Sequence, residues 1–192
     1  MKRSLLVIAF ASLCTMPAVA VAQGLGVIGG LSYGTAPNAN GVLPGTLKGN
    51  SGFAIGLAAE TGGVVGFGIN GMYAQRGFSS SVAGFSQKYS YIDVPIYLKV
   101  SLPNPVITPF GFVGPQGSFE MNCDGGGGSC PSGRSKTTFS GVIGAGLKFG
   151  MLGGLSLQGR YVYGLTNLNL STVSNAGNYQ PRSFMILAGI GF

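Results

Sequence analysis

The sequence predicts an all-β protein, an eight-stranded antiparallel up-and-down β-barrel that crosses a membrane. Charged residues make up only 8% of the 192 residues, whereas a typical soluble domain has about 25%. Glycine supplies 36 residues without the strict repeat of collagen, and 45% of the chain is hydrophobic. Apolar side chains recur at every second position in eight segments, which is the period of a β-strand. Collagen and ordinary disorder are therefore excluded.

The first 22 residues have the pattern of a secretory signal peptide. Met1–Arg3 is a basic start, residues 5–13 are mainly apolar, and small residues precede a cleavage site between Ala22 and Gln23. The apolar run is shorter than the ~20 residues that a membrane-spanning helix needs. We therefore expect residues 1–22 to be removed and residues 23–192 to form the barrel.

Seven of the eight expected strands have a clear apolar face. In chain order these faces are Leu25-Val27-Leu31-Tyr33, Phe53-Ile55-Leu57-Ala59, Val65-Phe67-Ile69-Tyr73, Ile92-Val94-Ile96-Leu98-Val100, Phe139-Ile143-Ala145-Leu147-Phe149, Leu155-Leu157-Tyr161-Tyr163-Leu165 and Phe184-Ile186-Ala188-Ile190-Phe192. The remaining strand, expected at 107–119, has no defined phase, because Phe110 and Phe112 compete with Val113 and Phe119 for the apolar face.

The connections between these strands alternate in length. Short connections are expected at 61–63, 101–106 and 151–154, and long ones at 35–50, 77–87, 120–136 and 168–182. All long loops then lie at one end of the barrel. This asymmetry is typical of outer-membrane barrels, in which strands cross lipid only because a closed sheet satisfies every backbone group.

The opposite face of the well-phased strands carries all of their charges. We expect a polar network in the lumen, made of Glu60, Arg76, Asp93, Lys99, Lys148 and Arg160 together with Tyr89, Tyr91 and Tyr97. Alternation alone also fits a soluble, lipocalin-like barrel with an apolar interior that binds a ligand. The outer surface of such a soluble barrel must be polar enough to face water. The strands carry too few charged residues for that, which favours the membrane barrel.

Several function classes lose support from the composition. The chain has no histidine, the usual general base and the commonest metal ligand, so we expect no enzyme, no cofactor and no metal. The basic residues are scattered rather than clustered, which argues against nucleic acid. Two G-x-G-x-x-G matches, at Gly24 and Gly66, lack the helix and the acidic residue of a nucleotide site. Cys123 and Cys130, exported to an oxidising compartment, are expected to form a disulfide.

The strand Tyr89-Ser-Tyr91-Ile-Asp93-Val-Pro95-Ile-Tyr97-Leu-Lys99 resembles the Y-x-(D/E)-(I/V)-P-x-x-L-K strand of small outer-membrane β-barrels, the PorT-like or porin family. The resemblance implies a bacterial outer-membrane protein of the eight-stranded type. The terminal Phe192 resembles the signal that the barrel-assembly machinery recognises in its clients. Outer-membrane lipid and lipopolysaccharide are the implied surroundings.

Two functions remain open at this point. One is a structural or adhesin-like surface protein that meets a partner through its long loops, with a filled lumen. The other is a narrow porin or small-solute channel, with a slight anion preference because four basic residues face two acidic ones in the lumen.

Overall fold

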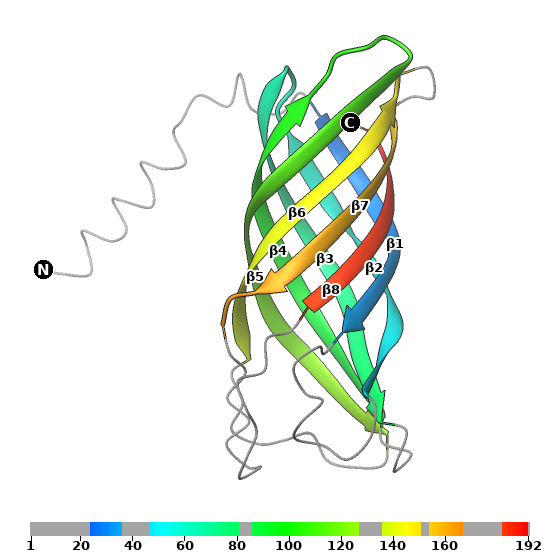
Figure 1. Cartoon of the computed structure of the whole chain (residues 1–192), viewed down its shortest axis with the longest axis vertical. Coiled ribbons are helices and arrows are strands. Elements are labelled where there is room, and N and C mark those ends of the chain that lie inside the picture. Colours follow the sequence, from blue (N-terminus) through cyan, green and yellow to red (C-terminus); the bar gives the residue numbers. More distant parts are fainter. Residues whose placement is uncertain are drawn as a thin grey trace, which may run out of the picture.

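A computed structural model describes residues 24–35, 47–80, 86–126, 136–150, 154–166 and 182–191. They form one closed antiparallel barrel of eight strands (Figure 1). The strands are β1 (Gly24–Thr35), β2 (Leu47–Glu60), β3 (Val65–Ser80), β4 (Ser86–Ser101), β5 (Ile107–Gly126), β6 (Thr137–Phe149), β7 (Leu155–Gly164) and β8 (Arg182–Ile190). The predicted fold class is confirmed. In the described residues, no helix has the length and apolar character needed to cross a membrane.

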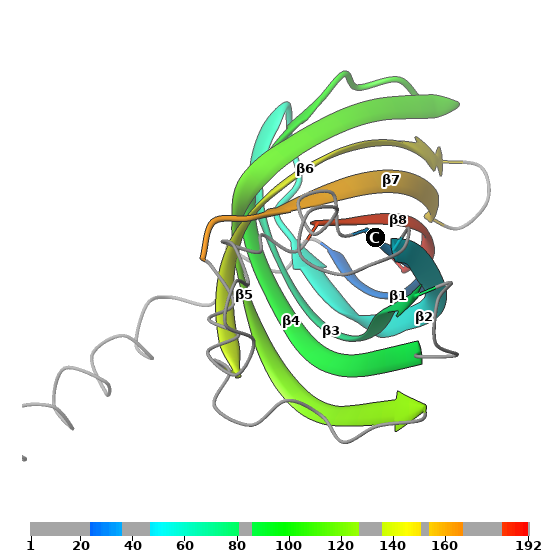
Figure 2. The ribbon, with the colours of Figure 1, turned by 60° about the horizontal axis from the view of Figure 1, so that its bottom comes forward.

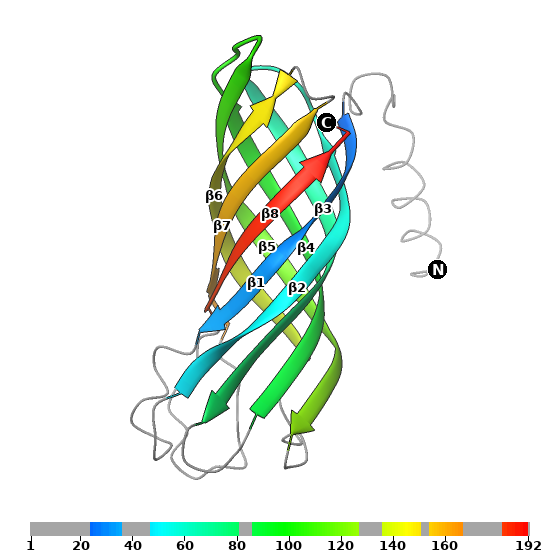
Figure 3. The ribbon, with the colours of Figure 1, turned by 90° about the vertical axis from the view of Figure 1, so that its right-hand side faces the viewer.

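Each strand pairs with its neighbours in the chain, and β1 pairs with β8 to close the sheet. In this seam Val27 lies opposite Ile190 and Tyr33 opposite Phe184. Figure 3 shows β1 and β8 side by side, and Figure 2 shows the strands arranged around one axis. Closure leaves neither β1 nor β8 as a free edge over the paired residues, so the ladder is continuous around the barrel.

The apolar face of the alternating pattern points outward. Leu25 and Leu57 are 69% and 67% exposed, whereas Ile28, on the opposite face of β1, is fully buried. A soluble barrel with an apolar interior would show the reverse arrangement, so that alternative is wrong. Aromatic side chains form an outward belt toward the long-connection end, here called the aromatic girdle: Tyr33, Phe53, Tyr73, Phe119, Phe139, Tyr161, Tyr163 and Phe184.

The phase of β5, which the sequence leaves undefined, is set by its partner strand. Phe110 and Phe112 point inward and are 7% and 4% exposed, while Val113 and Phe119 point outward. The residues opposite them on β6 are Gly146 and Gly144. A Cβ atom at either glycine would collide with the facing phenylalanine ring. Glycine on one strand therefore makes the room that an inward aromatic ring on the next strand fills.

The strands extend beyond their apolar segments at the long-connection end. The connection expected at 77–87 is reduced to residues 81–85, because β3 continues to Ser80 and β4 begins at Ser86. Likewise β5 continues to Gly126, into the segment expected as a loop. Three long connections remain instead of four, and Figure 1 shows β3, β4 and β5 reaching past the shorter β7 and β8. At this end polar residues replace the alternating apolar ones, but the backbone hydrogen bonds between neighbouring strands continue.

Glycines on the inner face set how closely strands can approach. A Cβ atom at Gly30 would overlap the carbonyl oxygen of Ile186 on β8, whereas one at Gly141, on the outer face of β6, would meet nothing within 4 Å.

We predict that Gly30→Ala lowers the free energy of unfolding by about 3 kcal/mol, the upper range for overpacking. Gly141→Ala should leave it unchanged or slightly higher. Urea denaturation of both variants checks this, and equal effects would contradict it.

Candidate functional site

The nine residues predicted for the lumen lie on inward positions of β2, β3, β4, β6 and β7. Seven are buried, and Arg76 and Lys148 are half-buried. The structure brings most of them together in three groups along the barrel axis. These groups lie at the short-turn end, at the centre and toward the long connections.

The first group lies at the short-turn end and is built around Glu60, the last residue of β2. One carboxylate oxygen pairs with the ammonium group of Lys99. The other accepts a hydrogen bond of 2.7 Å from the hydroxyl of Tyr97. The Lys99 ammonium also lies 4.5 Å from the ring centroid of Phe110, a cation–π contact. Both oxygens of this buried carboxylate are therefore satisfied.

The second group lies at the centre and joins β3, β4 and β7 through Asn70. With its amide oxygen toward Arg160, Asn70 accepts hydrogen bonds from both terminal guanidinium nitrogens at 3.0 and 3.2 Å. Its amide nitrogen then donates to the Tyr97 hydroxyl at 3.0 Å, which links this group to Glu60. Arg160 also donates to the Gln158 side chain at 3.0 Å and lies 5.4 Å from the ring centroid of Phe112. The guanidinium group thus crosses the lumen while only 1% exposed.

The third group lies toward the long connections. Arg76 of β3 forms an ion pair with Asp93 of β4, whose side chain is fully buried. The Arg76 guanidinium lies 5.2 Å from the ring centroid of Tyr91. The second carboxylate oxygen of Asp93 has no hydrogen-bond partner among the described residues, and neither has the amide oxygen of Gln116. Oxygens buried in this way are favourable positions for internal water.

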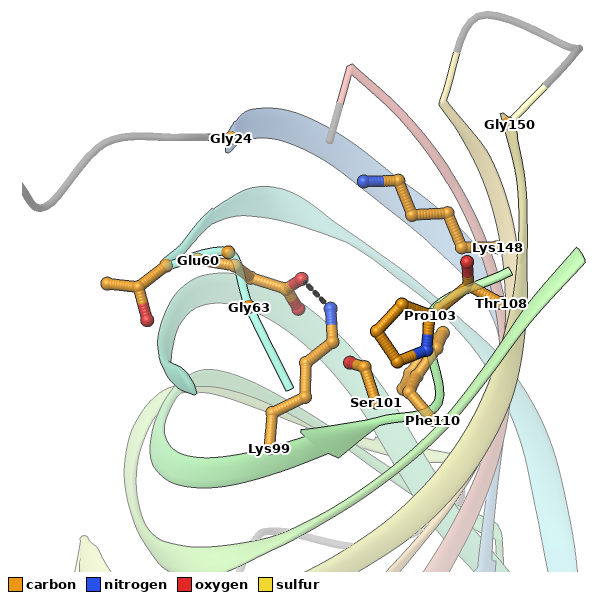
Figure 4. A pocket seen from close by; sticks show the side chains of 12 residues that line it. Gly24, Glu60, Gly63, Lys99, Ser101, Pro103, Thr108, Phe110, Lys148 and Gly150 are labelled. Carbon is orange, nitrogen blue, oxygen red and sulfur yellow. Dashed lines mark hydrogen bonds and ion pairs between the residues drawn. The ribbon is translucent and has the colours of Figure 1, made fainter. Parts of the chain in front are cut away.

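Lys148 stands apart from these groups. It lies on β6 at the short-turn end and makes no hydrogen bond or ion pair with the residues that the structure describes. It lines a pocket of about 310 Å³, the mouth pocket (Figure 4). The lining residues are Gly24, Glu60, Thr61, Gly62, Gly63, Lys99, Ser101, Pro103, Thr108, Phe110, Lys148 and Gly150.

Apolar side chains fill much of the space between the polar groups, which the sequence pattern did not predict. The inward face was expected to be polar or small, but it also carries Ile28, Met72, Val142, Val162, Met185 and Leu187, each 2% exposed or less. The prediction failed because an enclosed lumen needs volume as well as polarity. An eight-stranded barrel is just wide enough for side chains to fill it.

Sequence analysis also missed the uncharged members of the network. Asn70, Gln116 and Gln158 are buried on the inner face of β3, β5 and β7. Their positions alternate with the apolar residues, so the signal was present for Asn70 and Gln158. Gln116 could not be placed without the phase of β5.

Some predicted residues lie outside the described ranges. These are Ala22 and Gln23 at the proposed signal cleavage site, Cys130 and Phe192. Cys123 lies on β5 and is disulfide-bonded, but its pairing with Cys130 stays a prediction, as does the signal peptide. The described residues contain no group of three or more side chains of the types that commonly hold a metal ion.

Comparison with known proteins agrees with this architecture. A family model for the outer membrane protein beta-barrel domain matches residues 6–192. The outer membrane enzyme PagL is similar in structure, with a TM-score of 0.53 and 15% identity over 86% of this chain and 99% of that chain. OprG from Pseudomonas aeruginosa has a TM-score of 0.51 and 14% identity, over 88% and 96% of the two chains.

Neisserial surface protein A gives a TM-score of 0.51 and 13% identity, over 88% of this chain and 98% of that chain. At such identities these three likenesses concern the fold alone. No curated protein sequence matches the chain significantly.

The Arg76–Asp93 pair provides a test of the buried network. Removing one partner leaves the other charge buried, which typically costs about 3–5 kcal/mol. We predict that Arg76→Met lowers the free energy of unfolding by this amount in urea denaturation of the refolded protein. The double variant Arg76→Met, Asp93→Leu should recover most of the loss, because neither charge then remains unpaired. Lys88→Met, at an exposed position of the adjacent strand, is the control and should change stability by less than about 0.5 kcal/mol.

Proposed function

The chain belongs to the family of outer membrane protein β-barrel domains, and we propose that it acts there as a non-enzymatic structural and surface-interaction protein with a closed lumen. Its place is the bacterial outer membrane. In barrels of this type the short turns face the periplasm and the long loops face outward. The end of the barrel beyond the aromatic girdle is therefore the external end.

The filled cross-section of the barrel is the observation that carries this proposal. Arg160 from β7 reaches the sulfur of Met72 on β3 at 3.6 Å and lies beside the ring of Phe112 on β5. These side chains meet from three separate walls, and each is buried. Met185 and Leu187 on β8 are fully buried as well. These contacts across the centre support a lumen that is closed to solutes.

The non-enzymatic part of the proposal rests on chemistry rather than on fold. PagL is an outer membrane enzyme of similar fold, so the barrel itself does not decide the matter. Here the whole sequence lacks histidine, which is the usual proton carrier for hydrolysis at neutral pH. The carboxylates predicted for the lumen, Glu60 and Asp93, are each engaged in an ion pair.

The surface-interaction part of the proposal rests on the external end. There β3, β4 and β5 continue beyond the aromatic girdle to Ser80, Ser86 and Gly126. Their exposed residues in this extension include Lys88, Asn122 and Asp124, which suit contact with water or a polar partner rather than with lipid. Together with the long connections, this extension offers a surface to a partner outside the cell.

Lipopolysaccharide is the surrounding that we propose for this end of the barrel. Arg182 begins β8 at the level of the girdle, and its guanidinium carbon lies 4.7 Å from the ring centroid of Tyr163. A cation held against an aromatic ring at the membrane interface suits an anionic headgroup. Recognition by the barrel-assembly machinery, with Phe192 as its signal, belongs to the same proposal.

A narrow, anion-preferring channel is the second candidate. The unpartnered buried atoms of Asp93, Gln116 and Arg160 favour it, because internal water at these atoms would begin a polar path through the lumen. Conduction would then require the side chains at the centre to move.

Conductance across planar lipid bilayers separates the two candidates. We expect purified, refolded protein to insert without discrete conductance steps. Steps that disappear in Arg160→Gln but persist in Lys88→Gln would overturn the closed-lumen proposal, because only Arg160 lies in the central cross-section. Insertion is verified independently by protease protection of the barrel.

A matched pair of leucines tests the lipid-facing surface. Leu57, which lies on β2 between the girdle residue Phe53 and the strand end at Glu60, and Leu102, in the turn after β4, are 67% and 65% exposed. We predict that Leu57→Arg destabilises the protein by about 2–4 kcal/mol in vesicles, the cost of arginine at the bilayer midplane. Leu102→Arg should be nearly neutral, because the turn faces water. Urea titration in lipid vesicles measures both, and equal tolerance would contradict a bilayer around β2.

A further inference from the structure

The mouth pocket at the short-turn end has an unbalanced charge. Its ionisable residues are Glu60, Lys99 and Lys148. The Glu60 carboxylate pairs with Lys99 through one oxygen and accepts the Tyr97 hydroxyl through the other. Lys99 is held further by the ring of Phe110 beneath it. Glu60 and Lys99 therefore neutralise each other, and the positive charge of Lys148 is left over.

Lys148 is placed to meet a ligand rather than a side chain. Figure 4 shows it reaching into the opening from the wall opposite the Glu60–Lys99 pair. It is half-buried and has no hydrogen bond or ion pair within the described ranges. A charge inside a concave site with low-dielectric walls attracts a counter-ion more strongly than the same charge on an open surface. The free space in front of this ammonium group is therefore electropositive.

Ser101 and Lys99 are the pocket side chains, besides Lys148, that keep hydrogen-bond donors available among the described residues. Ser101 is 7% exposed, and its hydroxyl makes no hydrogen bond with the described residues. The Thr108 hydroxyl donates its proton to the Asn104 carbonyl at 2.9 Å and is therefore not available as a donor to an anion. The Lys99 ammonium has three donors, of which Glu60 occupies one. A ligand here would meet two ammonium groups and a serine hydroxyl around a volume of about 310 Å³.

We propose that the mouth pocket binds a small oxyanion, a carboxylate or phosphate group, between Lys148 and the wall formed by Lys99 and Ser101. Phe110 lines the pocket, and its ring stacks on that of Phe112, which contacts Tyr97 in the packed centre. The site therefore holds its ligand and does not pass it onward. Because short turns face the periplasm in barrels of this type, the ligand is a periplasmic one. The proposed surface role concerns the other end of the barrel and does not depend on this site.

Titration with inorganic phosphate and, separately, with acetate tests the proposal by NMR of the refolded protein in detergent micelles. We expect saturable shifts of the backbone amides of Gly62, Gly63, Ser101 and Gly150, which line the pocket. Lys148→Gln should weaken binding about tenfold, the loss of one charge-assisted contact. Lys148→Arg should retain binding, because the charge is kept. Saturation by only one of the two anions would support the site and identify which oxyanion it takes.

Lys88→Gln is the matched control, since it removes an equal charge at the external end of the barrel. It should leave the dissociation constant unchanged. Adding sodium chloride should weaken binding through screening. The absence of saturable shifts with either anion would overturn the proposal, and so would an equal effect of Lys88→Gln and Lys148→Gln. The amide spectrum of each variant shows directly that the barrel is folded, so a failure to bind cannot be mistaken for a failure to fold.

Discussion

Backbone hydrogen bonding in lipid is the constraint on which the rest of this structure depends. Hydrocarbon offers no partner for an amide or a carbonyl, and each unpaired group costs several kcal/mol. A sheet can meet this demand only by closing on itself, which β1 and β8 achieve through pairs such as Val27 with Ile190. Closure divides every strand into an outward face in contact with lipid and an inward face that must fill a narrow tube. The low charge and the alternating pattern of the sequence are consequences of that division.

The inner face solves a packing problem and an electrostatic problem together. Inward rings such as Phe110 and Phe112 occupy space that glycines on β6 leave open. The same rings lie against the cations Lys99 and Arg160. Glu60, Tyr97, Asn70 and Arg160 then join four strands, β2, β4, β3 and β7, through one chain of hydrogen bonds. Charge is tolerated in the interior because Glu60, Asp93 and Arg160 are each paired or hydrogen-bonded to neighbouring side chains.

The period-two pattern was sufficient to predict the fold class, the outward face and the inward position of charges such as Glu60 and Arg160. It could not give the phase of β5, because that phase depends on Gly144 and Gly146 of another strand. It did not predict that the apolar side chains of Ile28 and Leu187 point into the lumen. These residues differ from the lipid-facing apolar residues only in occupying the alternate positions of their strands. It also ended β3 and β5 too early and began β4 too late, because hydrogen bonds between strands continue where apolar side chains stop. The features that could not be predicted depend on which residues lie opposite each other on neighbouring strands. A single sequence does not contain that register.

The seam between β1 and β8 has a consequence for how the protein folds. It joins residues from 147 positions apart (Thr35 and Arg182) to 163 positions apart (Val27 and Ile190), so its contacts have the largest sequence separation in the barrel and form late. Until Arg182–Ile190 arrives, β1 and β7 are open edges that can pair with any other strand. Closure of the barrel therefore requires β8. A chain that stopped before β8 would be an aggregating sheet rather than a smaller barrel.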